Sequence, residues 1–291
     1  MPELPEVEVC RMGIAPELLG REIRAVVIRA PRLRHEIPPA LRELLPGCLI
    51  VDVRRRGKYL LIDCRRGNGK GGVEGTLIVH LGMSGNLRFV PSELPPEKHD
   101  HFDLVLPDQI LRFADPRRFG VILWHPGPPA AVAAHPLIAV LGVEPLAGDF
   151  TAAWLHQALA RRQAPVKPVL MDGHLVVGIG NIYASESLFR AGISPLRAAS
   201  RISRLRCGVL VDAVRETLSA AIAAGGSSIR DYVHSDGGAG CFQIQAGVYD
   251  RAGQNCLRCG GTVRQIRQAG RSSYYCPGCQ QIGRASCRER V

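Results

Sequence analysis

The chain has 291 residues, enough for about two domains, and 46% of them are hydrophobic, which excludes a disordered basic tail. Its 37 Lys and Arg outnumber 26 Asp and Glu, so a polyanion such as nucleic acid is the expected partner and an anionic membrane surface the less favoured one. The sequence has neither a run of 18 apolar residues nor a signal-peptide pattern, which predicts a cytosolic protein.

The first six residues, MPELPE, have two interpretations. Removal of Met1 would expose Pro2 as a secondary amine with a pKa near ~8, a nucleophile at neutral pH, beside Glu3 as a carrier of protons. Alternatively, the segment is an ordinary helix start, with Pro at the first helical position and Glu3 and Glu6 complementing the helix dipole. The segment taken alone favours the helix start.

The hydrophobic period predicts a helix over residues 3–19 and then changes to that of short strands. The predicted strands are 21–30, 49–53, 59–63, 76–81, 86–90, 102–106, 110–114 and 121–124. Pro and Gly clusters separate them, which is typical of an all-β sandwich or barrel.

The pattern turns helical from about Ala147. The predicted helices are 151–161, 165–171, 182–191, 203–224 and 228–234. We therefore expect an N-terminal domain at residues 2–130, a linker at 131–148, a helical domain at 149–240 and a small metal-binding segment at 241–281. Residues 282–291 have no apolar period, and we interpret them as a non-native tail.

Four cysteines form two Cys-x-x-Cys pairs, Cys256 with Cys259 and Cys276 with Cys279, separated by sixteen residues. Two such pairs at the base of a hairpin supply four thiolates to one tetrahedral structural Zn²⁺. A redox dithiol is the alternative, which two copies at this spacing disfavour. The segment from Cys256 to Cys279 contains no acidic residue but several arginines, among them Arg271, and this suits a phosphate backbone. The other cysteines are interpreted as buried hydrophobic residues.

Two glycine-containing segments are candidate DNA contacts. Residues 178–183, GIGNIY, lack the third glycine of a dinucleotide loop, so we expect a turn into a helix whose N–H groups and Asn181 either bind a phosphate or form a plain cap. Residues 115–120, DPRRFG, form a turn that presents two arginines beside Phe119. Such a turn is either a solvated hairpin tip or a wedge for a base stack.

Two further features have weaker signals. Lys58 follows three arginines and precedes an apolar strand, so it is either a solvated charge or a phosphate contact. His99, His101 and Asp103 alternate along one strand face. We interpret them as surface or hydrogen-bonded residues rather than metal ligands.

Together, these segments occur in one order that closely resembles the bacterial formamidopyrimidine-DNA glycosylase family. The matching segments are residues 2–6 (PELPE), 58–60 (KYL), 80–85 (HLGMSG), 98–101 (KHDH), 115–120 (DPRRFG), 178–186 (GIGNIYASE) and the four-cysteine ribbon. The resemblance runs from Pro2 to about Gln280. It implies an α+β fold with an N-terminal β-sandwich, a helix-two-turn-helix module and a zinc-ribbon hairpin.

The resemblance also implies a bifunctional base-excision repair enzyme. Such an enzyme excises 8-oxoguanine and formamidopyrimidines from damaged double-stranded DNA and cleaves the abasic strand by β,δ-elimination. Pro2 would form an imine with the sugar, Glu3 would be the general acid/base, and Lys58 would contact phosphate or assist proton transfer. Glu6 would contact the flipped base.

The implied DNA contacts come from several segments. Met83, Arg117 and Phe119 would fill the void left by the flipped base, with Arg117 facing the orphaned cytosine. The residues implied to hold phosphates are Asn181 and Arg271, with His80, Lys167 and Tyr183 as lesser candidates. Residues 227–242 match a loop that closes over the lesion.

The resemblance leaves two alternatives. An endonuclease VIII-type enzyme shares the N-terminal proline but prefers oxidised pyrimidines, and a zinc-dependent DNA-binding protein would lack catalysis altogether. Leu4 and the void-filling residues favour the purine-specific enzyme. We expect a monomer in the cytoplasm, associated with the nucleoid.

Overall fold

The computed structural model describes residues 2–67, 72–226 and 246–280. These residues form two compact units. The first contains residues 2–140 and 221–226, and the second contains residues 141–220 and 246–280. The boundary at residues 140 and 141 falls inside the segment predicted to be a linker.

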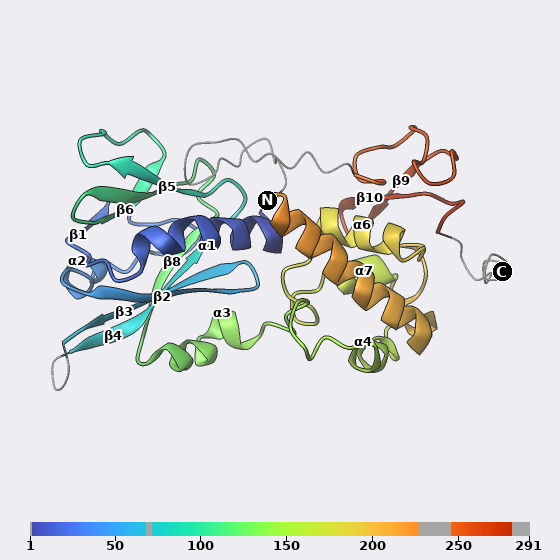
Figure 1. Cartoon of the computed structure of the whole chain (residues 1–291), viewed down its shortest axis with the longest axis horizontal. Coiled ribbons are helices and arrows are strands. Elements are labelled where there is room, and N and C mark those ends of the chain that lie inside the picture. The colour runs from blue at the N-terminus through green and yellow to red at the C-terminus, as the bar shows by residue number, and fades with distance from the viewer. Residues whose placement is uncertain (1, 68–71, 227–245, 281–291) are drawn as a thin grey trace. The chain divides into compact units, whose positions relative to one another are not determined.

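Helix α1 (Leu4–Leu18) opens the first unit and lies along β2 and β3 (Figure 1). Glu3 is its N-cap, and Glu6 Oε2 accepts the Glu3 N–H at 2.7 Å, which is half of a capping box. The apolar side of the helix, including Ile14 and Leu18, is buried in the core. The helix predicted from the apolar period is confirmed.

Two four-stranded antiparallel sheets follow, and they confirm the predicted β-sandwich. One has the order β1-β6-β7-β5 and the other β2-β3-β4-β8. The strands of the first are β1 (Ala25–Ile28), β5 (Asn86–Pro91), β6 (Asp100–Val105) and β7 (Gln109–Ala114). Those of the second are β2 (Leu49–Arg56), β3 (Tyr59–Arg66), β4 (Val73–His80) and β8 (Val121–Pro126). One hydrophobic cluster takes residues from α1 and both sheets.

Short helical elements complete the first unit. They are α2 (Leu41–Leu44), the 3₁₀ helix η1 (Pro129–Ala134) and α3 (Pro136–Ala139). Residues 129–139 are therefore mostly helical, although their Pro and Ala content predicted a plain linker. Both η1 and α3 begin at a proline, whose fixed φ suits the first turn of a helix.

Asp103, which was predicted to share a strand face with His99 and His101, lies in a group of ion pairs. Asp103 is buried between Arg112, with Nε at 3.0 Å, and Arg29, with Nη2 at 2.5 Å. In the described part of the chain, the only cluster of possible metal ligands is the four-cysteine group. Asp103 is therefore hydrogen-bonded, and His101 Nε2 lies 3.0 Å from the Asp115 carbonyl oxygen. That these residues do not bind a metal stays a prediction.

The second unit is helical and ends in a hairpin. Its elements are α4 (Ala152–Leu159), α5 (Val166–Leu170), α6 (Asn181–Arg190), η2 (Ala199–Arg201), α7 (Arg204–Ala223), β9 (Arg264–Gln268) and β10 (Arg271–Tyr275). The residues of α7 up to 220 belong to this unit. Thr151 caps α4 through its hydroxyl, and α6 packs against β10. The helix predicted at 228–234 lies outside the described residues.

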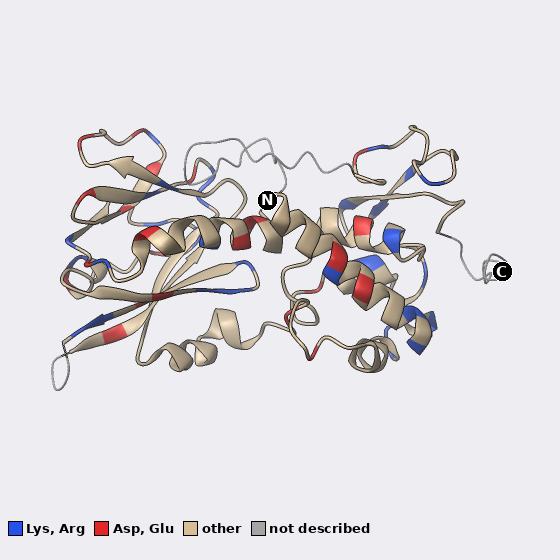
Figure 2. Cartoon of the chain, viewed as in Figure 1, with Lys and Arg blue, Asp and Glu red and all other residues tan. Residues whose placement is uncertain are grey.

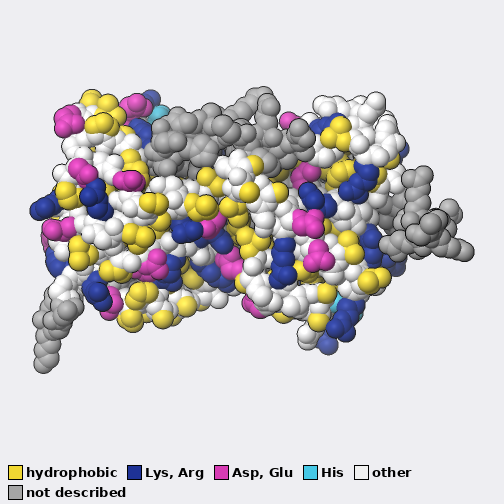
Figure 3. All heavy atoms as spheres, viewed as in Figure 1, with side chains coloured by type: hydrophobic (Ala, Val, Ile, Leu, Met, Phe, Trp, Pro, Cys, Tyr) yellow, Lys and Arg dark blue, Asp and Glu magenta, His cyan; other side chains and the backbone are white. Residues whose placement is uncertain are grey.

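The surface is mixed in character. On the face drawn in Figure 3, apolar side chains are scattered among charged ones. Figure 2 shows Lys and Arg on the hairpin strands and near the start of α7. Among the described helices, none combines the length and the apolar character that crossing a membrane requires.

Candidate active site and nucleic-acid interface

Pro2 lies outside helix α1. The helix begins at Leu4, its N-cap is Glu3, and the proline within its first turn is Pro5. The interpretation of the N-terminus as a helix start therefore applies to Glu3 and Pro5, and Pro2 has no part in capping. Pro2 and Glu3 are both buried.

Glu6 supports Glu3. It is fully buried, and its carboxylate accepts the Glu3 backbone N–H. This bond holds the backbone immediately after Pro2 in an extended conformation, with Glu3 at φ −103° and ψ −171°. Glu6 was predicted to contact a flipped base, and the structure places it against the backbone that carries Pro2.

Arg55 connects helix α1 to the turn that carries Lys58. Its Nε donates to Glu8 Oε2 at 2.8 Å, and its Nη1 donates to the Gly57 carbonyl at 2.9 Å. Arg11 donates to the other oxygen of Glu8 from Nη2 at 2.7 Å. Burial alone would raise the pKa of Glu8, but the hydrogen bonds from Arg11 and Arg55 outweigh it and hold that pKa below its usual range. Glu8 is therefore an anion that fixes the Lys58 turn to α1.

His80 stands at the end of β4, next to the Lys58 turn. Its ring lies 4.7 Å from that of Tyr59, and its Nδ1 accepts the Gly82 N–H at 2.9 Å. Burial, reinforced by the charges of Lys58 and Arg34, lowers the pKa of His80 to about 4. His80 is therefore neutral at pH 7, so it can meet DNA as a hydrogen-bonding group and not as a cation.

Two loops bring the predicted void-filling side chains together. Met83 lies in the loop after β4, and Arg117 and Phe119 lie in the loop after β7. The Arg117 guanidinium carbon lies 5.0 Å from the centre of the Phe119 ring, and both side chains are exposed. A Cβ built on Gly82 would lie 2.5 Å from the Phe119 carbonyl carbon. The loops therefore touch through their backbones, which only glycine allows.

In the second unit, Lys167 joins three segments. Its ammonium donates to Asn181 Oδ1 at 2.6 Å, to the Ser272 carbonyl at 2.9 Å and to Ser273 Oγ at 2.8 Å. Lys167 is 1% exposed. Because it holds the Asn181 oxygen, it orients the Asn181 amide so that the NH₂ group can donate elsewhere. Lys167 was predicted as a phosphate contact, but its burial fits a supporting role instead.

Three other predicted phosphate contacts, Asn181, Tyr183 and Arg271, lie in the same unit as Lys167. Arg271 is exposed at the start of β10, and with Lys167 it lines a cavity of about 230 Å³. Asn181 is the first residue of α6, where backbone N–H groups lack helical partners and attract anions. Tyr183 is fully buried, so it supports this helix from within. Asn181, which is bonded to Lys167, and Arg271, which lines a cavity with it, therefore both offer donors.

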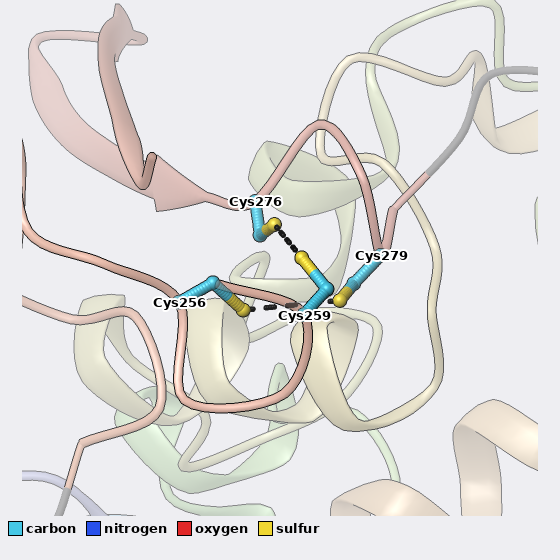
Figure 4. Close-up of side chains that lie close together, drawn as sticks. All are labelled: Cys256, Cys259, Cys276 and Cys279. Carbon is cyan, nitrogen blue, oxygen red and sulfur yellow. Dashed lines mark hydrogen bonds between the residues drawn. The ribbon is translucent and has the colours of Figure 1, made fainter. Parts of the chain in front are cut away.

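Figure 4 shows the four cysteine side chains pointing toward one another. Their sulfur atoms all lie within 4.8 Å, with Cys256 to Cys279 at 3.8 Å and Cys259 to Cys276 at 3.4 Å. Four thiolates around Zn²⁺ at bond lengths of about 2.3 Å stand about 3.8 Å apart, so the group fits a tetrahedral zinc ion. Burial would raise the pKa of Cys256, but backbone N–H groups, including that of Arg258, lower it to about 7. Burial and the neighbouring thiol groups raise the pKa values of Cys276 and Cys279, so zinc binding must itself favour their thiolates.

One carboxylate that the sequence did not single out fastens the zinc segment to α6. Glu186 accepts the backbone N–H groups of Gly247, Val248 and Tyr249 at 2.7 to 3.0 Å. Its partners are 61 to 63 residues away, so no local pattern could have identified it. The loop predicted over residues 227–242 to close on the lesion lies outside the described residues.

Three family models match the chain. The formamidopyrimidine-DNA glycosylase N-terminal domain matches residues 1–122, the formamidopyrimidine-DNA glycosylase H2TH domain matches residues 141–233, and the zinc finger found in FPG and IleRS matches residues 253–282. The matches follow the order of sandwich, helical module and cysteine hairpin seen in the structure.

Similar proteins match over nearly the whole chain. The formamidopyrimidine-DNA glycosylase of Dechloromonas aromatica is 77% identical over 96% of this chain and 100% of its own, and that of Paraburkholderia phymatum is 54% identical over 97% and 100%. A Lactococcus lactis Fpg in complex with abasic-site DNA has a TM-score of 0.86 at 34% identity, covering 96% of this chain and 100% of its own. The Lactococcus lactis protein was also solved with DNA containing an oxidized pyrimidine, with a TM-score of 0.85 at 33% identity over 97% and 100%.

Proposed function

The chain belongs to the formamidopyrimidine-DNA glycosylase family, and we propose that Pro2, freed by removal of Met1, is its catalytic nucleophile. The protein is a base-excision repair enzyme, a DNA glycosylase that excises 8-oxoguanine and formamidopyrimidines from damaged double-stranded DNA and an AP lyase that cleaves the abasic strand. Its zinc finger holds one structural Zn²⁺ through Cys256, Cys259, Cys276 and Cys279.

The observation that carries this assignment is the place of Pro2 in the fold. It precedes the N-cap of α1, while Glu3 and Pro5 supply the capping that a helix start needs. With Met1 removed, Pro2 is a secondary amine with a pKa near ~8, far below that of a lysine, so an unprotonated fraction is present at neutral pH.

The amine lone pair forms a bond to the sugar C1′ as the bond from C1′ to the base breaks. Opening of the sugar ring then gives an iminium between Pro2 and C1′. Glu3, adjacent to the amine, transfers protons during these steps. The iminium makes the neighbouring C–H bond acidic, so β-elimination releases the 3′ phosphate and δ-elimination the 5′ phosphate, and water finally hydrolyses the Pro2 adduct.

Lys58 is proposed to hold a phosphate near the reacting sugar or to assist proton transfer. Arg55 connects the Lys58 turn to α1, the helix that follows Pro2 and Glu3. This connection supports a common site for the three residues. Glu6 is proposed to contact the flipped base at the start of the same helix.

The remaining residues are proposed to hold the DNA. Asn181 and Arg271 bind phosphate directly, and Lys167 and Tyr183 hold Asn181 in place. Met83, Arg117 and Phe119 enter the duplex where the damaged base leaves it, with Arg117 facing the orphaned cytosine, and His80 supports the Met83 loop. We further propose that the enzyme acts as a monomer in the cytoplasm, at the nucleoid where its substrate lies.

Borohydride trapping tests the nucleophile. Protein without Met1 or a tag is incubated with a duplex that contains 8-oxoguanine opposite cytosine, and borohydride reduces any iminium to a stable adduct. We expect an adduct at Pro2 by peptide mass spectrometry and none with Pro2→Gly. Strand cleavage that survives in Pro2→Gly would show that another amine is the nucleophile.

A substrate panel separates the enzyme from its alternatives. We expect faster release of 8-oxoguanine than of thymine glycol. The reverse order would favour an endonuclease VIII-type preference, for which the complex of the Lactococcus lactis relative with oxidized-pyrimidine DNA provides a reason to test. Tight binding to every lesion without cleavage would favour a non-catalytic DNA-binding protein.

A further inference from the structure

Asp115 is a buried carboxylate between the two loops that carry the void-filling side chains. One of its oxygens accepts the Ser84 hydroxyl at 2.7 Å, and the other accepts the Gly120 N–H at 2.7 Å. It is fully buried, and within the described part of the chain no Lys or Arg pairs with it. A buried carboxylate held only by neutral donors is costly, so its place suggests a purpose other than fold stability.

The backbone of Asp115 is held as firmly as its side chain. Its N–H donates to the His99 carbonyl at 3.0 Å, and its own carbonyl accepts from His101 Nε2 at 3.0 Å and from the Arg118 N–H at 3.2 Å. Arg118 has a φ of +55°, a left-handed conformation that is uncommon for residues other than glycine. The loop of residues 115–120 is thus held by hydrogen bonds in a conformation that includes one uncommon backbone angle.

Ser84 extends the connection to Arg117. The Ser84 oxygen accepts the Arg117 N–H at 3.2 Å while its hydroxyl donates to Asp115. Ser84 follows Met83, and Gly82 lies against the backbone of Phe119. A single carboxylate therefore sets the position of the Met83 loop relative to Arg117 and Phe119.

We propose that Asp115 is a positioning residue for the recognition of the base opposite the lesion. The inference rests on the proposed function, in which Arg117 faces the orphaned base. Cytosine presents hydrogen-bond acceptors to a guanidinium, whereas adenine presents a different arrangement of donors and acceptors. Distinguishing the two bases therefore requires an accurately placed Arg117. Asp115 and Ser84 supply that accuracy through the Arg117 backbone, without contact to DNA.

The test compares single-turnover excision of 8-oxoguanine opposite cytosine and opposite adenine. The variants are Asp115→Asn, which preserves shape but replaces one acceptor with a donor, and Ser84→Ala, which removes the bond to Arg117. The control is Asp63→Asn. Asp63 is another buried carboxylate that accepts a hydroxyl, from Thr76 Oγ1 at 2.5 Å, but it lies in the other sheet and pairs with Arg54. Thermal unfolding of each protein measures its stability.

We expect the wild-type ratio of the two rates to favour cytosine and to fall about tenfold in both Asp115→Asn and Ser84→Ala, since small displacements of reacting or recognising groups have effects of this order. Asp63→Asn should lose stability and keep the ratio. If Asp115→Asn fails to fold, the result with Ser84→Ala decides.

Two outcomes overturn the inference. One is a ratio that stays at the wild-type value in the folded variants, which would give Asp115 a purely structural role. The other is a wild-type ratio near one, since the wild-type enzyme would then not distinguish cytosine from adenine opposite the lesion. Failure of the proposed function looks different, because wild-type protein would then excise neither substrate.

Discussion

Arg55 is bound to Glu8 by a buried ion pair, with Nε 2.8 Å from Oε2 and both side chains less than one fifth exposed. The same guanidinium holds the Gly57 carbonyl, so the turn before Lys58 is attached to the second turn of α1. The bond therefore links α1, which follows the proposed nucleophile Pro2, to the turn that carries Lys58, which is proposed to act at the same sugar.

Arg55→Lys should slow catalysis more than it weakens DNA binding. Lysine keeps the charge but cannot donate to Glu8 and Gly57 in two fixed directions, so the Lys58 turn loses its attachment. We expect single-turnover excision to fall by about 10- to 100-fold, in line with the cost of misplaced catalytic groups. The matched control is Arg65→Lys, an exposed position on β3, which should excise at the wild-type rate. Equal rates for both variants would remove Arg55 from the site.

The elements with a regular apolar period were predictable from the sequence. The predicted strand 59–63 falls within β3, and the predicted strand 76–81 overlaps β4 up to His80. The spacing of the cysteines predicted the cluster of four sulfur atoms. The short helices between residues 129 and 139 were not, because Pro and Ala without an apolar period indicate only a break.

The connections that organise the site were not predictable either. Ser84 and Asp115 are 31 residues apart, and Glu8 and Arg55 are 47 residues apart. Each pair meets only after the sheets have folded, and a carboxylate or a hydroxyl in the sequence does not show which distant donor it will face. The roles of Pro2 and Lys58 came from the family resemblance, because each residue alone also suited a plain structural role.

Removal of zinc should abolish DNA binding and leave the first unit folded. The zinc segment has a small hydrophobic cluster, so the metal supplies much of its folding free energy. We expect Cys279→Ser to lose zinc and tight DNA binding, while Cys10→Ala, at a buried cysteine of α1, keeps both. Metal content and DNA affinity are measured on the same samples. A zinc-free protein that still binds the damaged duplex tightly would contradict this role for the ribbon.

Acidification should destabilise the first unit through His80. Its folded pKa of about 4 lies below the unfolded value of 6.5, so the unfolded state binds a proton first as the pH falls. The contribution of His80 to the free energy of unfolding is fully present above pH 6.5 and is lost progressively toward pH 4, with a loss of about 2 kcal/mol at pH 5. His80→Asn, whose amide oxygen can accept the Gly82 N–H, should show less of this loss between pH 7.5 and 5. The free energies of unfolding are measured by denaturant titration. If they fall equally with pH in wild type and in His80→Asn, groups other than His80 cause the loss.

Glu186→Gln should loosen the attachment of the zinc segment to α6. A carboxylate can accept three N–H groups, whereas the glutamine NH₂ would face a donor and leave it unsatisfied, at a cost of about 1–3 kcal/mol. Urea denaturation measures the loss of unfolding free energy, and we expect hydrogen exchange to become faster at residues 247–249. Glu216→Gln breaks an exposed pair with Arg190 and should cost less than about 1 kcal/mol. Similar losses in the two variants would show that the three N–H bonds add nothing.

The salt dependence of DNA binding should separate Lys167 from Arg271. A residue that neutralises a phosphate releases a counterion, so its removal lowers the slope of log affinity against log salt by about one. Arg271→Gln should weaken binding and lower the slope in this way, because the side chain is exposed at the proposed phosphate site. Lys167→Met should weaken binding by about tenfold or more with the slope unchanged, since its buried ammonium acts by holding Asn181, Ser272 and Ser273. A reduced slope for Lys167→Met would instead mean that the ammonium meets DNA directly, and Lys167 would return to the set of phosphate contacts that the sequence predicted.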